Sequence, residues 1–270
     1  MQGLNLQHIT ERVISICQLA EEQVITPIVN ANGFGIESKD NTGRNFVTKA
    51  DLETELLLKE ELSNLLPTAG FIAEETAAST QPKGLNWIID PIDGTTNFMH
   101  QAPPYCISVA LANDEEILCG VIYELFHQEV FYAWKNGGAY LDRKKLSVST
   151  IENLSESLLV TGFPYDQGSV FDDWISLFGS LTKKTQGVRR YGAAAVDLCY
   201  VAAGRLEGFY EYSLNAWDVA AGVLLVQEAG GKVTDFHGGA DYLFGRELVS
   251  TNTKVHTGLL KIIQQHFSKA

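Results

Sequence analysis

The chain has 270 residues, of which 45% are hydrophobic and 20% charged, a balance typical of a globular protein rather than a disordered or fibrous one. Its formal net charge of −13 disfavours binding to nucleic-acid phosphates. No apolar run approaches the ~20 residues of a membrane helix, and residues 1–10 lack the features of a signal peptide. We therefore expect a cytoplasmic protein with no membrane and no nucleic-acid partner.

The first half of the chain combines helical patterns with a β-rich stretch. Apolar residues recur every three or four positions over 4–30, which predicts an amphipathic helix, and a second helix is predicted over 51–66. The polar stretch 37–45 between them is expected to be a loop. Strands are predicted over 71–73, 87–89, 105–112, 117–123 and 129–134.

After residue 147 the pattern changes to alternating strands and helices. Strands are predicted over 158–161 and 206–211, and helices over 170–181, 192–203 and 216–229. The basic pair Arg189-Arg190 is expected to lie in a solvated loop or at a subunit contact. No repeat or low-complexity linker is present, so the halves 1–150 and 151–270 should pack as one unit. The fold class expected is α+β, with layered sheets and helices.

The stretch WIIDPIDGTTNF contains the clearest chemical signal. An apolar strand ends at Asp90, Pro91 enforces an extended step, and Asp93 precedes the permissive Gly94. Thr95 can open a short helix whose free N–H groups face an anion. Two carboxylates at that place would repel a bare phosphate unless a divalent cation lies between them. The alternative interpretation is structural, with an Asp-Gly turn and a capping aspartate.

Two further acidic positions have the same character. Glu74 and Glu75 follow the predicted strand 71–73, and Asp218 lies in the first turn of the predicted helix 216–229. Neighbouring residues at a strand end face opposite ways, so only one of the two glutamates can join a cluster. The alternatives are an exposed acidic turn and an acid that favours a helix N-terminus.

Taken together, these motifs resemble the inositol monophosphatase family of metal-dependent, lithium-sensitive sugar phosphatases. The resemblance runs through Asn45-Phe-Val-Thr48-Lys-Ala-Asp51, Ala73-Glu-Glu-Thr76, 90–98, Gly192-Ala-Ala-Ala195, Trp217-Asp-Val-Ala-Ala-Gly222 and Glu228-Ala-Gly-Gly231. It implies a layered αβαβα sandwich, a homodimer, and hydrolysis of a small-molecule phosphomonoester such as myo-inositol 1-phosphate or a related polyol phosphate.

The resemblance also implies a site for two Mg²⁺ ions. One ion would be held by Glu74, Asp90 and the carbonyl of Ile92, and the other by Asp90, Asp93 and Asp218. Some members hold a third, weaker ion on the residue that matches Glu74. Oxygen donors without a nearby His or Cys suit Mg²⁺ better than Zn²⁺. Two ions ~3.5–4 Å apart can clamp a phosphate and ionise a water.

The remaining roles that the resemblance implies concern the water and the substrate. Thr95, with Asp51 and Glu74, would orient and activate the attacking water, while the N–H groups of Gly94 and Thr95 bind phosphate oxygens. The polyol would face Asp93, Gly192, Ala193, Ala194 and Glu211. Many relatives have Ser or Thr in place of Ala193, which predicts broader selectivity here. Whether Lys39 matches the family's loop lysine is left open.

Several alternatives stay open at this point. Within the same fold the substrate could be histidinol phosphate, NADP or fructose 1,6-bisphosphate, although Thr96-Asn97-Phe98 argues against the main fructose bisphosphatase lineage. The same triplet also argues against the phosphatases that act on 3′-phosphoadenosine phosphate. A different class is a metal-binding regulatory protein without catalysis. The intact set Asp51, Glu74, Thr95 and Asp218 argues against that class.

Overall fold

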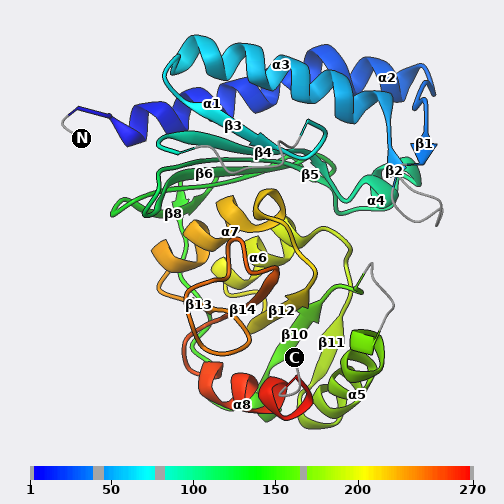
Figure 1. The fold of residues 1–270 in the computed structure, drawn as a ribbon, viewed down its shortest axis with the longest axis vertical. Helices are drawn as coiled ribbons and strands as arrows, with labels where there is room; N and C mark the ends of the chain where they lie inside the picture. The colour runs from blue at the N-terminus through cyan, green and yellow to red at the C-terminus, as the bar shows by residue number, and fades with distance from the viewer. Residues whose placement is uncertain (1–2, 39–45, 77–82, 165–168, 268–270) are drawn as a thin grey trace.

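The protein is layered in the order αβαβα, which confirms the expected fold class (Figure 1). The structure, a computed structural model, describes residues 3–38, 46–76, 83–164 and 169–267. Lys39 lies outside the described residues. The first layer consists of α1 (Leu6–Ala20), the π-helical turn η1 (Glu21–Ile25), α2 (Thr26–Asn30) and α3 (Lys49–Leu65).

The second layer is a seven-stranded sheet with the order β3-β4-β5-β6-β7-β8-β9. Only the β3–β4 pair is parallel. The strands are β3 (Gly70–Ala73), β4 (Asn86–Asp93), β5 (Cys106–Ala112), β6 (Ile117–Glu124), β7 (Glu129–Trp134), β8 (Gly138–Leu141) and β9 (Lys144–Lys145). Alternate residues of β5 pack on opposite sides, with Val109 toward α1 and α3 and Ala110 toward the middle layer. Both faces of this sheet are therefore covered.

The second sheet has the strand order β11-β10-β12-β14-β13 and a mixture of parallel and antiparallel pairs. Its strands are β10 (Leu158–Thr161), β11 (Gly187–Arg189), β12 (Gly208–Tyr212), β13 (Lys232–Thr234) and β14 (Glu247–Thr251). Its outer face is covered by α5 (Ser169–Lys184) and α8 (His256–His266) (Figure 1). The smaller elements are β1 (Glu37–Ser38), β2 (Phe46–Val47), α4 (Thr95–Met99) and the 3₁₀ turn η2 (Leu154–Glu156).

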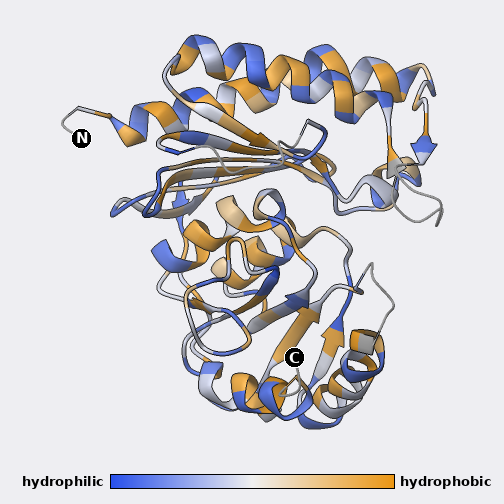
Figure 2. Cartoon of the chain, viewed as in Figure 1, coloured by the Kyte–Doolittle hydropathy of each residue, from blue (hydrophilic) through white to orange (hydrophobic). Residues whose placement is uncertain are grey.

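The middle layer between the two sheets is formed by α6 (Ala194–Ala202) and α7 (Ala216–Glu228), and both helices are mostly hydrophobic and buried (Figure 2). Small residues let these helices approach their neighbours closely. A Cβ on Gly120 of β6 would lie 2.8 Å from the Cα of Ala221, so this strand and α7 meet backbone to backbone. Helix α7 is thereby held close against the seven-stranded sheet.

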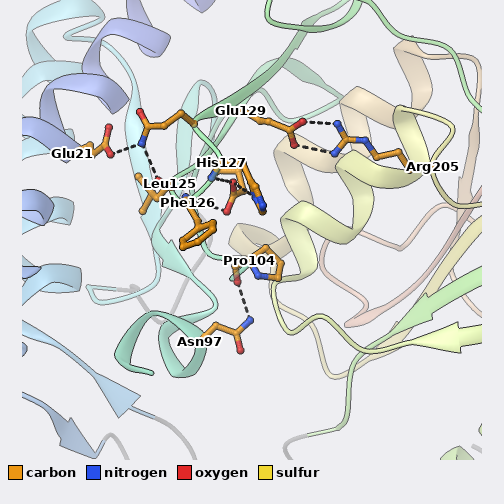
Figure 3. Close-up of polar contacts among 10 residues, drawn as sticks. Glu21, Asn97, Pro104, Leu125, Phe126, His127, Glu129 and Arg205 are labelled. Carbon is orange, nitrogen blue, oxygen red and sulfur yellow. Dashed lines mark hydrogen bonds and ion pairs between the residues drawn. The ribbon is translucent and has the colours of Figure 1, made fainter. Parts of the chain in front are cut away.

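Contacts also tie the first half of the chain to the second. Arg205, just after α6, donates from both terminal nitrogens to the carboxylate of Glu129 on β7, at 2.9 and 2.5 Å (Figure 3). This hydrogen bonding lowers the pKa of Glu129. The division at residue 150, which falls between β9 and β10, stays a prediction.

Most predicted elements are present, with informative differences in their ends. The predicted helix 4–30 contains the wide turn η1, and the predicted strand 87–89 continues as β4 to Asp93. Within β4 the register against β5 shifts between Asp90 and Asp93, because the Pro91 ring removes a ladder donor. Elements after residue 231, namely β13, β14 and α8, were not predicted. No helix in the described part of the chain is long and apolar enough to cross a bilayer.

Candidate active site

A cavity of about 470 Å³ opens beside the end of β4 and the first turn of α7. Its volume lies within the range of small-molecule sites. Four acidic side chains that line it are called the acidic floor, and they are Glu74, Asp90, Asp93 and Asp218. Four other lining residues are called the rim, and they are Phe163, Arg190, Ser213 and Arg246.

Parallel pairing of two strands places Glu74 beside Asp90. Ala73 of β3 is the register partner of Ile89 on β4, and the next residue on each strand is acidic. The N–H of Glu74 donates to the carbonyl of Ile89 at 3.1 Å. The pKa of Asp90 is raised well above its ordinary value by burial, then by the negative charges of the other floor residues, and by a hydrogen bond with Glu74. The strand ends therefore bring these carboxyls into direct contact.

Asp93 is held between the two halves of the protein. It follows the register shift in β4, and its Oδ2 accepts from the N–H of Ala195 in the first turn of α6 at 2.7 Å. The thiol of Cys106 donates to the same oxygen at 3.8 Å. Burial raises the pKa of Asp93 to about 7, while the Ala195 N–H opposes that rise. Its carboxyl is thus oriented by backbone from α6.

Gly94 has the left-handed φ of 88° at the start of α4. A Cβ there would lie 3.1 Å from the carbonyl oxygen of Pro104 and 3.2 Å from that of Gly192, so the turn is packed tightly between two chain segments. The Asn97 side chain fixes the same segments by donating to the carbonyls of Pro104 at 2.8 Å (Figure 3) and of Tyr191 at 2.7 Å. The α4 turn is therefore held in place from both sides.

Thr95 and Asp51 are brought together although they lie on different elements. The Thr95 hydroxyl is 3.4 Å from Oδ1 of Asp51 and 3.2 Å from the carbonyl oxygen of Ile92, so either atom can accept its hydrogen bond. Asp51 is fully buried, and its Oδ2 accepts from the N–H of Thr48 at 2.7 Å as part of the capping box of α3. The helix cap thus aims the other oxygen at Thr95.

Asp218 reaches the cavity from the first turn of α7. Its Oδ2 accepts from the N–H of Asn215 at 2.7 Å, which is the capping arrangement that places the side chain back over the helix start. Burial raises its pKa well above the ordinary value, and the charges of Asp93 and Glu74 add to the rise. A residue from the second half therefore completes the acidic floor.

The chemistry of the floor suits a hard cation. In the described ranges, no three His, Cys, Asp or Glu side chains are arranged to hold a metal ion as they stand. Burial, followed by the charges of Glu74, Asp93 and Asp218, raises the pKa of Asp90 well above its ordinary value. The donor atoms of the acidic floor are oxygens, which Mg²⁺ and Ca²⁺ prefer as ligands. Burial is the main cause of the raised pKa values of Asp90, Asp93 and Asp218, and a divalent cation would relieve the repulsion between neighbouring charges that adds to it.

Glu211 lies on β12, is 8% exposed, and is not among the residues that line the cavity. Its carboxylate lies against the Cα of Gly162, where any Cβ would collide with it. Burial raises its pKa to about 8, the charge of Asp218 adds to the rise, and the Arg190 guanidinium opposes it. Gly162 was not singled out from the sequence, because the need for a glycine there comes from a contact with another strand.

The turn 192–194 is divided between the cavity and the core. Gly192 lines the cavity, whereas Ala193 and Ala194 are buried and are not among its lining residues. The Ala194 and Ala195 N–H groups instead interact with Asp93, so this turn acts on the floor through backbone.

The rim residues were not predicted as part of the site. Arg190, expected in a solvated loop or subunit contact, stacks its guanidinium 5.4 Å from the centre of the Phe163 ring. Arg246 donates to the Ser213 carbonyl at 3.2 Å and hydroxyl at 3.0 Å. These contacts join loops that are far apart in sequence, so no local motif indicates them.

Comparison with known proteins identifies the family of this chain. The sequence profile of the inositol monophosphatase family matches residues 5–268. The chain belongs to the inositol monophosphatase family. It is 42% identical over 225 residues to an inositol-1-monophosphatase of Synechocystis sp., covering 83% of this chain and 78% of that protein. It is 38% identical over 252 residues to a protein of Pseudomonas aeruginosa named Nus factor SuhB, covering 92% of each.

A solved structure shares the fold. The inositol monophosphatase of Anabaena (Nostoc) sp. superimposes with a TM-score of 0.82 at 34% identity, covering 97% of each chain. As a member of the inositol monophosphatase family, the protein is a phosphatase that hydrolyses phosphoric monoesters.

Proposed function

We propose that the protein is a Mg²⁺-dependent phosphatase of myo-inositol 1-phosphate or a related polyol phosphate. The observation that carries this proposal is the acidic floor, in which carboxyls from β4, the end of β3 and α7 line one cavity, and burial together with the neighbouring charges raises the pKa values of Asp90 and Asp218. Such a floor repels a phosphate dianion on its own. Bound cations reverse that repulsion, which explains how an acidic protein can take an anionic substrate.

The ligand assignment is the one that the family resemblance implies, and all five of its residues line the cavity. Glu74, Asp90 and the Ile92 carbonyl would hold one Mg²⁺, and Asp90, Asp93 and Asp218 a second, with a third, weaker ion on Glu74. When bound, Mg²⁺ supplies charge neutralisation for the phosphate and lowers the pKa of the attacking water. The hydrogen bond that joins Asp90 to Glu74 would then be exchanged for contacts to the cation.

The protein's own groups would position the water and the phosphate. Asp51, fixed by the Thr48 cap, accepts from the Thr95 hydroxyl and leaves the hydroxyl oxygen free to accept a hydrogen bond from the water. Glu74 would complete the activation of that water. The N–H groups of Gly94 and Thr95 would donate to phosphate oxygens, in a turn that Asn97 holds rigidly.

The hydroxyl groups of the polyol would be recognised by a different set of protein groups. Glu211 and Asp93 are acceptors for hydroxyl groups, and Gly192 contributes backbone at the cavity wall. Ala193 and Ala194 would act through the position of this turn, since their side chains are buried. Because Ala193 offers no hydroxyl, we expect broader selectivity than in relatives that have Ser or Thr there.

Phosphate release from a panel of phosphomonoesters tests this proposal. We expect turnover of myo-inositol 1-phosphate with Mg²⁺, none after EDTA with metal removal verified, and recovery on adding Mg²⁺. Preference for histidinol phosphate, NADP or fructose 1,6-bisphosphate would change the proposed substrate and leave the proposed metal mechanism in place. Full turnover in chelator would remove the metal mechanism. No turnover of any ester would favour a metal-binding regulatory protein, and the Nus factor name of the P. aeruginosa relative is one reason to test for that outcome.

Three further parts of the proposal have their own measurements. Li⁺ should inhibit by taking the place of the second ion, which an activity titration at fixed Mg²⁺ would show. Light scattering should give the mass of a homodimer. Fractionation of the native cells should find the protein in the cytoplasm.

A further inference from the structure

Helix α3 presents two buried carboxylates to the cavity side of the protein, one turn apart. Asp51 contacts Thr95, whereas Glu55, which is 2% exposed, has no part in the mechanism described above. Residues four apart lie on the same face of a helix, so both point away from solvent toward the loops that follow β3 and β4. A buried carboxylate is costly unless its oxygens accept hydrogen bonds.

Both oxygens of Glu55 accept hydrogen bonds from the segment that follows β3. The N–H of Glu75 donates to Oε2 at 2.8 Å, and the hydroxyl of Thr76 donates to Oε1. Lys59, one turn further along α3, is 3.5 Å from Oε1 and also contacts the Thr76 hydroxyl. Hydrogen bonds to an ionised carboxylate are stronger than neutral ones. The segment Glu74–Thr76 is therefore clamped by α3.

The same segment is anchored on its other side by the sheet, through the N–H of Glu74 to Ile89. Two anchors on consecutive residues, one from β4 and one from α3, fix the backbone from which the Glu74 side chain extends. We propose that Glu55 is a positioning residue, which holds Glu74–Thr76 so that the Glu74 carboxylate is directed at Asp90 and ready to bind a metal ion. This inference rests on the proposed function only in taking Glu74 as a metal ligand.

The inference is tested with isosteric variants and two readouts. Glu55→Gln keeps the size of the side chain but replaces one acceptor oxygen with an amide. Thr76→Val removes the hydroxyl that donates to Glu55, whereas Thr76→Ser retains a hydroxyl. Glu60→Gln, an exposed glutamate on the same helix, is the matched control for lost charge. The readouts are hydrogen exchange of the Glu75 amide and Mg²⁺ affinity by calorimetry, with circular dichroism to verify folding. Steady-state kinetics adds the Mg²⁺ concentration for half-maximal activity and the KM at saturating Mg²⁺.

Glu55→Gln and Thr76→Val should speed exchange of the Glu75 amide and weaken Mg²⁺ binding about 10- to 100-fold, the usual effect of losing a group that orients a metal ligand. The KM at saturating Mg²⁺ should change little, and Thr76→Ser and Glu60→Gln should resemble wild type. Unchanged exchange in Glu55→Gln would overturn the clamp. Faster exchange with unchanged Mg²⁺ affinity would show that Glu55 only stabilises the fold, and would overturn the positioning role.

Absence of Mg²⁺ binding by the wild-type protein would have a different meaning. It would overturn the proposed function, and with it the role of Glu74 as a ligand. The clamp itself would still be decided by the exchange rate of the Glu75 amide, so the two failures are distinguishable.

Discussion

The acidic floor and the rim of the cavity are built in different ways. Floor residues sit at strand ends or in the first turn of a helix, and backbone N–H groups orient them, as for Asp93 by Ala195. Rim residues lie on or beside loops, and side chains hold them, as for Arg190 against Phe163. Rigid elements position side chains more accurately than loops do. The rigid setting of the floor supports the proposal that it carries the reaction, while Glu211 and the turn 192–194 are proposed to determine selectivity.

The strongest test of this division is to remove one floor carboxylate at a time. Asp93→Asn and Asp218→Asn should each lower kcat by at least ~10²-fold, comparable to losing a group that stabilises the transition state. The metal-free variants should stay folded, because removing a charge relieves the repulsion that raises the neighbouring pKa values. Steady-state kinetics at saturating Mg²⁺ measures the effect. Wild-type turnover in Asp93→Asn would show that the ligand assignment is wrong.

A group that supports the floor should matter less than the floor itself. Thr95→Ala should lower kcat about 10- to 100-fold, the range seen when a residue that orients an essential group is lost. Thr95→Ser keeps the hydroxyl that donates to Asp51 and is the control. If Thr95→Ser and Thr95→Ala were equally slow, the methyl group rather than the hydroxyl would be the important part.

The side of the cavity that faces the polyol should affect substrates unequally. With Mg²⁺ bound nearby, which favours the ionised form of Glu211, Glu211→Gln should raise the KM for inositol 1-phosphate roughly ten- to a hundredfold, since a charge-assisted hydrogen bond contributes about 1.5–3 kcal/mol. A simple aryl phosphate, which lacks those hydroxyls, should be nearly unaffected. Gly162→Ala should give the same pattern, because its Cβ would displace the Glu211 carboxylate. Equal effects on both substrates would assign Glu211 to the fold or the metals.

The smallest effect concerns pH and stability without metal. Burial raises the pKa of Asp93 from 3.8 to about 7 and that of Glu211 from 4.5 to about 8, so the folded protein retains protons that the unfolded chain releases. Its stability should therefore fall as pH rises from 6.5 to 8.5, with Tm lowered by about 2–4 °C per kcal/mol lost. His256, whose pKa burial lowers from 6.5 to about 4, is neutral in the folded state over that range, whereas the unfolded imidazole is about half protonated at pH 6.5. This group therefore opposes the fall in stability, but only by a few tenths of a kcal/mol, on the order of RT ln 2.

Thermal unfolding at both pH values, with and without Mg²⁺, measures this dependence. Mg²⁺ should replace protons on the floor, so its stabilising effect should be larger at pH 8.5 than at 6.5. A metal-free Tm that rises with pH over this range would contradict the interpretation of the raised pKa values.

The floor could be predicted from sequence because each of its residues lies at or near the end of an element that is itself predictable. Asp90 and Glu74 come directly after apolar strands, and Asp218 begins an apolar helix. Their number and their motifs also match a known family. The parallel pairing of β3 with β4, which makes Glu74 and Asp90 neighbours, could not be derived from either strand alone.

The rest of the site depends on contacts that leave no local pattern. Asp197 is buried in α6, and burial, followed by the charges of Glu211 and Asp93, raises its pKa well above the ordinary value. Its sequence context is that of any helix. Arg246 contacts Ser213 across two loops, and the ends of β13 and β14 likewise depend on pairing with distant strands. Such features are set by tertiary packing, which overrides local preference.

During synthesis on the ribosome, all strands of the seven-stranded sheet emerge before α6 and α7 do. The sheet face that contains Ala110 and Ile122 is apolar, and the middle helices are its cover in the finished protein. The same helices bring Asp218 to the floor and the Ala195 N–H to Asp93. The same two helices therefore both cover this sheet face and complete the acidic floor, so a chain that ends before α7 lacks Asp218.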